Sequence, residues 1–374
     1  MTTLLHASGS AEFLRMVPAL AGFTPRRSIV LLPFHGSRTH GAMRMDLPDL
    51  KIDPEEYADI AIGLVSRVDA ADAVAIVVYA DDDPQPTRDG LVLPLSIHVA
   101  ELTACAQDAG LRLVDALIVT PGGWASYLDD EPQLNPLDAI AAVPDVPLIG
   151  DVSGDQHAGT DLPPADLATK ERVGRALVDI GRILEREEHG PLTGAENPQA
   201  IAALVVLEDL PDFFEMLLDS PESQPPFVTA ALLWCLDRPA FRDVALTQWA
   251  SDLAGGDRTL SAQYAYVELG ASMPDEVGER FLGRGPSPDP DRLQLALSVV
   301  RLAAARAPRR LRRGPLTLAA WLSWALGRST HAASYLDLVR EIDPEYGLAA
   351  LLRTMIGGGL LPEWAFRRDR GRRA

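Results

Sequence analysis

Strand-like stretches occur only in the first third of this chain, and this limits what the remainder can fold into. Residues 73–79 (AVAIVVY) are apolar at every position, and further apolar runs cover residues 28–34 and 112–120. A continuously apolar strand is typical of a sheet that is covered on both faces. Beyond Ala165 the apolar residues recur at helical spacing, and proline or glycine interrupts them at short intervals. The sequence therefore predicts an α/β N-terminal domain, a mixed sheet with flanking helices, followed by an all-helical, repeat-like C-terminal domain.

The helices expected to flank this sheet have recognisable ends. A first helix is expected from its N-cap Ser10 to just before Gly22. A second is expected over residues 53–68, because Asp53 is a favourable N-cap and a proline follows it. The segment 93–110 supplies a third helix. Two hairpins complete the sheet, the first joining residues 28–34 to 43–47 and the second joining residues 112–120 to 124–128.

The chain is too long for one ordinary hydrophobic core. Its 374 residues predict two domains, which we expect to comprise residues 1–164 and 165–374. Residues 129–164 are rich in proline, aspartate and glycine and show little periodicity. This composition predicts a long surface loop at the end of the first domain.

Charge is distributed unevenly along the chain. The net charge is −19, yet residues 286–374 carry 15 arginines against 8 acids, a net charge of +7. Residues 1–285 carry 19 basic and 45 acidic residues, a net charge of −26. An acidic surface repels phosphate, so we do not expect the whole protein to bind nucleic acid. Only the basic C-terminal end is suited to attract it.

The cysteine content and the hydropathy pattern indicate a cytoplasmic protein. The two cysteines, Cys105 and Cys235, each lie in an apolar helical stretch, so no disulfide framework or thiolate metal cluster is expected. This favours a reducing compartment. No segment approaches the ~20 uninterrupted apolar residues that a membrane-spanning helix needs, and the N-terminus lacks the pattern of a signal peptide.

Two passages of the N-terminal half resemble a known family. They contain Phe13-Leu14, Val17-Pro18, Gly22-Phe23, Pro25, Ser28-Ile29-Val30 and Met45-Asp46-Leu47-Pro48, and then Asp115 to Val119, Trp124 and Ser126-Tyr127. These residues are similar to the signature of the actinobacterial domain-of-unknown-function family numbered 4192. Here Asp129-Asp130-Glu131 stands where that family commonly has a polar or cysteine-containing stretch, so no thiol site is implied. The family has no established activity, and the resemblance therefore implies a fold but no catalytic residue.

The last helices resemble part of a tetratricopeptide repeat. Ala332, Leu336, Val339 and Pro344 have the spacing of the second helix of that repeat and its terminating proline. A stable solenoid needs at least ~3 repeats, and no clear copies with this period lie upstream. The pattern therefore favours a repeat-like bundle of α-hairpins.

Three consecutive aspartates, Asp81, Asp82 and Asp83, follow the strand that ends at Tyr79. In a parallel sheet this position is the carboxyl edge, where ligands usually bind. Carboxylates are ligands for hard cations, so the run is a candidate Mg²⁺ site for phosphoryl transfer. A solvated acidic turn before Pro84 is the simpler alternative, because an aspartate run has no ligand spacing of its own.

The segment 150–157 combines glycines with Asp151, Asp155 and His157, which makes it a candidate binding loop. It matches no phosphate-binding motif, and the other histidines have no zinc-ligand spacing, so we expect no metal or nucleotide site of a known type. A mobile linker is the alternative.

Basic and aromatic residues of the C-terminal half are candidates for binding a partner. The tryptophans at 234, 249, 321 and 324 lie in apolar helical windows, which favours core positions. Trp321 and Trp324 share one helical face, so they are also candidates for lining a concave groove. The basic clusters are Arg309, Arg310, Arg312 and Arg313, and, in the tail, Arg367, Arg368, Arg370, Arg372 and Arg373. Few aromatic residues are interleaved for base stacking, so nucleic acid is disfavoured. Intramolecular or protein contacts with the acidic half, and a frayed tail, are favoured instead.

These observations favour a non-catalytic scaffold or regulatory protein that binds a protein partner through its helical half, with no cofactor. The absence of a strong catalytic motif in the sequence supports this hypothesis. The alternative is an Mg²⁺-dependent phosphoryl-transfer enzyme, or a protein that binds a nucleotide or another small ligand at the acidic strand end. The identity of the partner is not indicated by the sequence.

Overall fold

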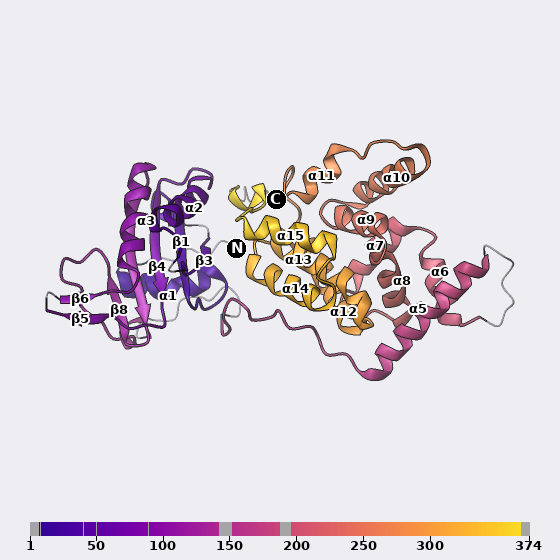
Figure 1. Cartoon of the computed structure of the whole chain (residues 1–374), viewed down its shortest axis with the longest axis horizontal. Helices are drawn as coiled ribbons and strands as arrows, with labels where there is room; N and C mark the ends of the chain where they lie inside the picture. The colour runs from indigo at the N-terminus through magenta and orange to yellow at the C-terminus, as the bar shows by residue number, and fades with distance from the viewer. Residues whose placement is uncertain are drawn as a thin grey trace. The chain divides into compact units, whose positions relative to one another are not determined.

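The computed structural model of the chain describes residues 7, 9–39, 41–49, 51–88, 90–141, 152–187 and 196–367. The chain divides into two compact units, which we name by their content. The sheet unit comprises Met1–Ala158 together with Phe366–Ala374, and the helical unit comprises Gly159–Ala365. Figure 1 shows the labelled strands in the indigo-to-magenta part of the chain, and helices and loops in the orange-to-yellow part.

Six strands form the main sheet of the sheet unit. β1 (Ser28–His35) pairs with β4 (Ala73–Tyr79), and β4 pairs with β7 (Arg112–Thr120). β4 and β7 are parallel, whereas β1 is antiparallel to β4, so the sheet is mixed as predicted. Its outer strands are β2 (Arg38–Thr39) and β3 (Met43–Asp46), both antiparallel to β1, and β8 (Gly123–Ser126), antiparallel to β7. A separate hairpin consists of β5 (Gln85–Thr87) and β6 (Gly90–Val92).

β4 is a central strand, and the side chains of residues 73–78 have no exposed surface. Successive side chains of a strand point to opposite faces of its sheet. On one face, side chains of β1 and β4 pack with those of α2 (Pro54–Ser66) and α3 (Ser96–Asp108). On the other face they pack with α1 (Ser10–Ala21) and the short α4 (Asp138–Ala141). The predicted burial of this strand on both faces is confirmed.

The ends of the flanking helices test the sequence prediction directly. The predicted cap of α2 is confirmed, because Oδ1 of Asp53 accepts a hydrogen bond from the backbone N–H two residues later at 2.9 Å. The predicted cap of α1 is wrong, because Gly9 occupies the N-cap position. The hydroxyl of Ser10 instead donates a hydrogen bond to Asp115 of β7 at 2.8 Å, which ties α1 to the sheet. α1 ends as predicted at Gly22, whose φ of 80° lies in the left-handed region.

The segment predicted as a long surface loop, residues 129–164, carries more structure than expected. Trp124 and Asn135 exchange two backbone hydrogen bonds of 2.9 and 2.8 Å, which extend the pairing of β8. Further along, the carbonyl of Gly154 accepts a hydrogen bond from the N–H of Thr24 at 2.9 Å. Such backbone pairings leave no periodic pattern of apolar residues, so the sequence did not indicate them.

Every regular element after β8 that the structure describes is a helix, which confirms the predicted all-helical half. Several of these helices begin with proline, whose fixed φ suits the first helical turn. They are α5 (Leu167–Glu187), α6 (Pro198–Val206), α7 (Leu210–Asp219), α8 (Pro226–Leu236), α9 (Pro239–Trp249), α10 (Leu253–Leu269), α11 (Asp275–Phe281), α12 (Pro290–Arg306), α13 (Arg313–Ala325), α14 (Ser329–Ile342) and α15 (Gly347–Gly357), with the 3₁₀ turns η1 (Arg309–Arg312) and η2 (Glu363–Phe366).

α13 is the innermost helix of the helical unit. All of its residues from Gly314 to Ala325 are buried, as expected for a helix that is enclosed by others. It packs against both α12 and α14 (Figure 1). Within the described residues, no helix combines the length and apolar character needed to span a bilayer.

The helix predicted near the C-terminus is present as α14. It buries Ala332, Leu336 and Val339 against the core, and Pro344 follows its last residue, Ile342, by two positions. The predicted helix and its stop are therefore confirmed. The resemblance to a tetratricopeptide repeat stays a prediction, because tight packing of small residues is common to many antiparallel helix pairs.

Candidate functional site

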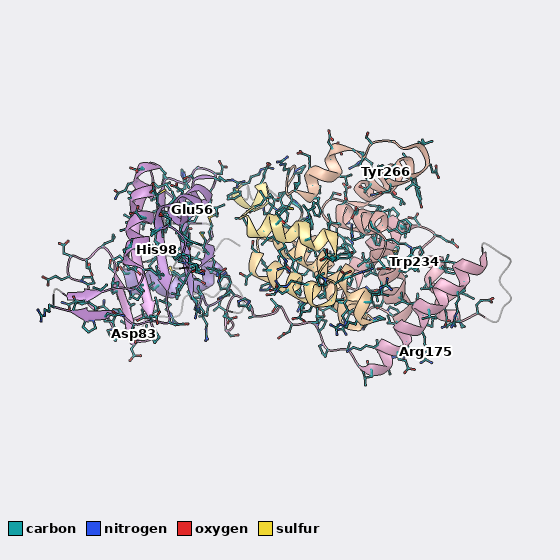
Figure 2. All side chains as sticks on the ribbon, viewed as in Figure 1. Glu56, Asp83, His98, Arg175, Trp234 and Tyr266 are labelled. Carbon is teal, nitrogen blue, oxygen red and sulfur yellow. The ribbon has the colours of Figure 1, made fainter. Side chains whose placement is uncertain are left out.

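The aspartate run lies beyond the carboxyl end of β4, in the sheet unit (Figure 2). Its three side chains are exposed. Asp81 forms an ion pair with Arg27 at 3.4 Å, and Oδ1 of Asp83 accepts a hydrogen bond from the backbone N–H of Gly122 at 2.7 Å. Two of the three acids therefore already have partners within the protein.

The second predicted cluster forms a local turn. Oδ1 of Asp155 accepts a hydrogen bond from the backbone N–H of His157 at 2.9 Å, and the carbonyl of Asp155 accepts one from the N–H of Ala158 at 3.0 Å. Asp151 lies outside the described residues. Asp155 thus stabilises the turn through its own backbone neighbours, as aspartate commonly does.

The residue that anchors this loop, Gln156, was not singled out from the sequence. Its side-chain amide bonds both the N–H and the carbonyl of Arg26, at 3.1 and 3.0 Å, and Gln156 is only 7% exposed. Because Arg27 pairs with Asp81, the loop and the aspartate run meet at one edge of the sheet. We call this region the carboxyl edge.

Neither thiol nor metal chemistry is supported by the described side chains. Among them, no group of three or more histidine, cysteine, aspartate or glutamate residues is placed to hold a metal ion. Both cysteines are free thiols. Burial raises the pKa of Cys105, reinforced by a hydrogen bond with Asp59, and burial also raises the pKa of Cys235. A raised pKa leaves each as an unreactive thiol at neutral pH.

Trp321 and Trp324 lie in the core of the helical unit, which corrects the expectation that they line a groove. Neither has any exposed surface. Their indole N–H groups donate hydrogen bonds to backbone carbonyls, Trp321 to Phe281 at 3.0 Å and Trp324 to Leu360 at 2.7 Å. The spacing of the two rings correctly indicated a shared face, but helices enclose α13 on all sides and that face points inward.

Arg313 is fixed between the ends of two helices. Its guanidinium pairs with Asp237, just after α8, at 3.1 Å and with Asp343, just after α14, at 2.8 Å. Burial acts to lower the pKa of Arg313, but the hydrogen bonds to the two carboxylates outweigh it and raise the pKa. Arg313 is therefore a permanent cation that joins α8, α13 and α14.

The other predicted arginines differ in whether their guanidinium groups bond to the rest of the protein. Arg309 donates a hydrogen bond to the carbonyl of Glu341, and Arg312 donates one to the carbonyl of Ala307, each at 3.1 Å. Arg310 is exposed and has neither a hydrogen bond nor an ion pair within the described part of the chain. Tail residues beyond 367 lie outside the described residues.

Two neighbouring hollows lie on the helical unit beside η1. The first, which we call the basic hollow, is lined by Arg309, Arg310, Arg313, Ile342 and Asp343. It presents three guanidinium groups and one carboxylate. Since that carboxylate already pairs with Arg313, the hollow has an excess of positive charge.

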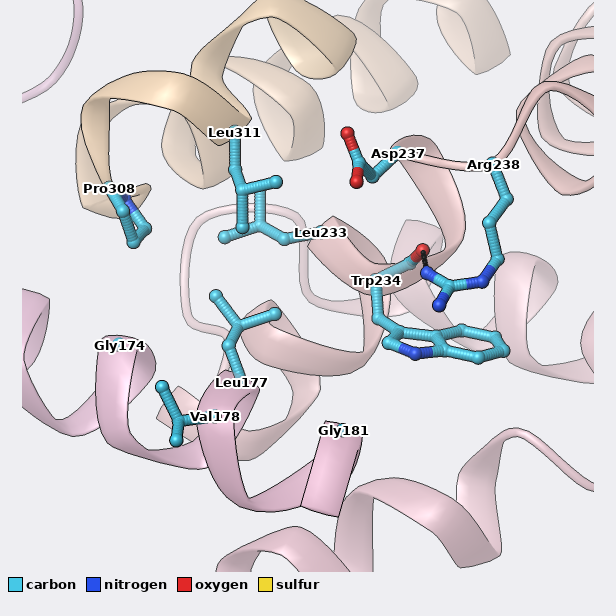
Figure 3. A pocket seen from close by; sticks show the side chains of 10 residues that line it. All are labelled: Gly174, Leu177, Val178, Gly181, Leu233, Trp234, Asp237, Arg238, Pro308 and Leu311. Atoms are coloured by element: carbon cyan, nitrogen blue, oxygen red, sulfur yellow. Dashed lines mark hydrogen bonds between the residues drawn. The ribbon is translucent and has the colours of Figure 1, made fainter. Parts of the chain in front are cut away.

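The second hollow is mainly apolar and has a volume of about 340 Å³. Figure 3 shows Leu177 and Val178 of α5 facing Leu233 of α8, Pro308 just before η1 and Leu311 within it. Val178 is 53% exposed, so the apolar lining reaches the surface. We call this the apolar hollow, and the two hollows together the η1 surface.

Glycines keep the α5 side of the apolar hollow open. Gly174 and Gly181 are two helical turns apart, so they lie on one face of α5. No atom lies within 4 Å of the position that a Cβ would take at either glycine. A larger side chain at either position would therefore project into free space at the hollow.

An arginine and a tryptophan form the rim of the apolar hollow (Figure 3). The guanidinium of Arg238 lies 3.6 Å from the ring centroid of Trp234 and donates a hydrogen bond to the Trp234 carbonyl at 2.7 Å. Trp234 also stacks on Phe241, with 5.7 Å between the ring centroids. Trp234, labelled in Figure 2, is only half-buried, unlike the core position expected for it. Arg238 follows the end of α8 and precedes α9, so this contact depends on how the chain turns between the two helices, and helical spacing provided no signal for it.

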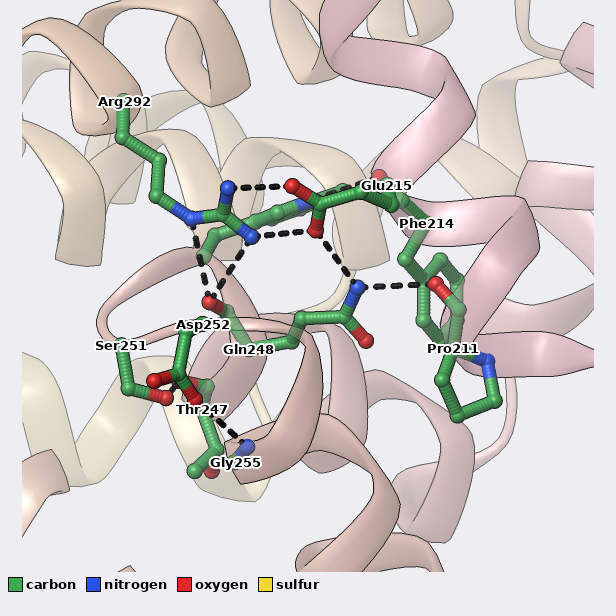
Figure 4. A network of polar contacts seen from close by, with 10 residues as sticks. Pro211, Phe214, Glu215, Thr247, Gln248, Ser251, Asp252, Gly255 and Arg292 are labelled. Atoms are coloured by element: carbon green, nitrogen blue, oxygen red, sulfur yellow. Dashed lines mark hydrogen bonds and ion pairs between the residues drawn. The ribbon is translucent and has the colours of Figure 1, made fainter.

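A polar network inside the helical unit provides a contrast with these hollows (Figure 4). Two guanidinium nitrogens of Arg292 donate to the carboxylate of Glu215, and the amide of Gln248 donates to the same carboxylate at 3.0 Å and to the carbonyl of Pro211 at 2.8 Å. These groups link α7, α9 and α12. Their bonding serves the packing of the helices.

Comparison with known proteins identifies a family but no characterised relative. A model of the family described as a domain of unknown function, DUF4192, matches residues 11–266 and 288–363. The matched residues come from both units, and the stretch between them contains α11. No curated protein and no solved structure matches the chain. The resemblance found in the N-terminal residues is thereby confirmed, and the chain belongs to the DUF4192 family.

Proposed function

We propose that this chain is a non-catalytic, intracellular binding protein that holds a protein partner at the apolar hollow of its helical unit. The observation that carries the proposal is an apolar hollow at the surface with Trp234 and Arg238 on its rim. Tryptophan and arginine are the side chains that most often dominate the binding energy of protein interfaces. The stacking of Arg238 on Trp234 holds both in one geometry before a partner binds, which reduces the entropy lost on association.

The shape of the hollow favours an extended or helical segment with apolar anchors. Its opposing walls are two helices, α5 and α8, and the glycines of α5 leave space between them. Grooves between helices commonly receive the apolar face of an amphipathic helix. Asp237 and Arg238 add a polar rim, which gives such a contact orientation.

The alternative function, an Mg²⁺-dependent enzyme or nucleotide-binding protein at the carboxyl edge, has no specific observation in its favour. Asp81 and Asp83 have partners within the protein. The alternative stays a prediction, and thermal unfolding with Mg²⁺ and a panel of nucleotides tests it, because saturating ligand at 100 times Kd stabilises a protein by ~2.7 kcal/mol.

The proposed function is tested by selecting peptides from a displayed random library on the full-length chain. We expect selected peptides to bind the wild type and to lose binding to Gly181→Leu, whose side chain fills the hollow. Gly63→Leu is the matched control, because Gly63 also lies inside a helix with no atom near its Cβ position, but in α2 of the sheet unit. Both changes should preserve the fold, since leucine favours helix over glycine. Peptides that bind wild type and Gly181→Leu equally would contradict the proposal.

A further inference from the structure

Resting on the proposed function, we infer that the partner segment is acidic as well as apolar, and that its carboxylates bind in the basic hollow while its apolar side chains fill the apolar hollow. This identifies the partner by its chemistry. It also gives a role to the arginine cluster, whose guanidinium donors are not all bonded within the described part of the helical unit.

The first argument is continuity between the two hollows. The turn from Pro308 to Arg313 lines both, with Pro308 and Leu311 in the apolar hollow and three arginines in the basic one. Asp237 of the apolar hollow pairs with Arg313 of the basic hollow at 3.1 Å. A single partner segment that fills one hollow is therefore placed beside the other.

The second argument is charge. The helical unit has 20 basic and 29 acidic residues, a net charge of −9, so an arginine-lined hollow is a local exception on it. Asp343 neutralises part of the charge by pairing with Arg313, and Arg309 binds a backbone carbonyl. The guanidinium of Arg310 keeps its five donors available within the described structure. A carboxylate matches a guanidinium in a two-bond geometry.

A nucleic-acid phosphate shares this chemistry but fits the surroundings less well. No aromatic side chain is among the described residues that line the basic hollow, and the Tyr346 ring beside it already faces the guanidinium of Arg313, 5.3 Å from the ring centroid. A base therefore has no free ring in that lining to stack on. The net negative charge of the helical unit repels a long polyanion overall. A short acidic segment concentrates its charge at one place and avoids this repulsion.

The test uses a peptide library with fixed apolar anchors and randomised charged positions, displayed to the full-length chain. We expect aspartate and glutamate to be enriched in peptides that bind. For a selected peptide, we expect about tenfold weaker binding to Arg310→Glu and a marked loss of affinity at high salt. Arg258→Glu is the matched control, because Arg258 is also exposed and belongs to the helical unit, on α10.

Each outcome decides between the two proposals. Neutral or basic peptides that bind equally to the wild type and to Arg310→Glu, yet not to Gly181→Leu, would overturn this inference and leave the proposed function standing. Peptides indifferent to Gly181→Leu would overturn both. A single-stranded oligonucleotide that displaces the peptide, and loses this ability with Arg310→Glu, would show that the basic hollow serves nucleic acid instead.

Discussion

The carboxyl edge of the sheet unit and the η1 surface of the helical unit each gather charged residues, but they differ in how far those residues are satisfied. At the carboxyl edge, Asp81 pairs with Arg27, Asp83 accepts a backbone hydrogen bond, and Gln156 bonds both backbone groups of Arg26. On the η1 surface, the exposed Arg310 makes neither a hydrogen bond nor an ion pair within the described residues, Val178 exposes apolar surface, and Trp234 is half-buried. Groups whose bonds are completed within the fold stabilise it, whereas exposed apolar and charged groups are suited to a partner.

The tryptophans of the helical unit show the same contrast on a smaller scale. Trp324 is fully buried, and its N–H donates to a backbone carbonyl. Trp234 has a surface position and an arginine on its ring. The following changes are ordered by their expected effect on stability and are designed to test this contrast.

Replacing Trp324 with alanine should cause the largest loss. We expect Trp324→Ala to lower the free energy of unfolding of the helical unit by about 3 to 5 kcal/mol, because a large buried ring is lost and a cavity remains. Denaturant unfolding followed by circular dichroism measures this. A loss of stability no greater than that caused by Trp234→Ala would contradict the contrast between the two tryptophans.

The stability contributed by the network of Arg292, Glu215 and Gln248 should depend on pH and should fall when Glu215 is replaced. The hydrogen bonds from Arg292 hold the pKa of Glu215 below its usual value of 4.5, against the opposing effect of burial. A lowered folded-state pKa gives stability that is present above pH 4.5 and is lost as the pH falls through the folded-state pKa. We therefore expect Glu215→Gln to cost about 1 to 2 kcal/mol at neutral pH, and less as the solution is acidified below that value.

The matched control for this network is Glu222→Gln, because Glu222 is exposed and makes no hydrogen bond or ion pair in the described structure. This variant should leave the free energy of unfolding unchanged both at neutral pH and below pH 4.5. Denaturant unfolding measures both variants. If Glu215→Gln lowered the free energy of unfolding equally at neutral and acidic pH, the charge of Glu215 would not be what stabilises the network.

Replacing Trp234 should separate stability from binding. We expect Trp234→Ala to cost only about 1 kcal/mol, because the ring is half-buried and loses one aromatic and one cationic contact. The same change should abolish binding of the selected peptides, as titrations of labelled peptide would show. Retention of full affinity would remove Trp234 from the proposed interface.

The smallest effect is expected at the carboxyl edge. Asp83→Asn should change the free energy of unfolding by less than about 0.5 kcal/mol, because the exposed amide oxygen can still accept the hydrogen bond of Gly122. Thermal unfolding with and without Mg²⁺ measures both the change in stability caused by Asp83→Asn and the response of each protein to the ion. An Mg²⁺-dependent stabilisation of the wild type that Asp83→Asn removes would restore the enzyme alternative.

Local patterns predicted the fold well because they act over short distances. The apolar run of β4, the Asp53 cap of α2 and the glycine stop of α1 are each decided by a few neighbouring residues. The Ser10 cap failed because its hydroxyl is bonded to Asp115, a residue 105 positions away.

The candidate site was less predictable, because tertiary packing decides which side chains remain at the surface. The spacing of Trp321 and Trp324 revealed a shared face but not that other helices enclose it. The apolar hollow is assembled from α5, α8 and the turn at Pro308, which are far apart in the sequence. The arginine cluster was recognised, yet only the structure separates the fixed Arg313 from the exposed Arg310.

The most direct test is amide hydrogen exchange of the full-length chain with and without a selected peptide. If the helical unit holds the partner, protection from exchange should increase in residues 174–181, 233–238 and 308–313, and exchange at the carboxyl edge should not change. Increased protection at residues 81–83 and 152–157, with none beside η1, would contradict the account.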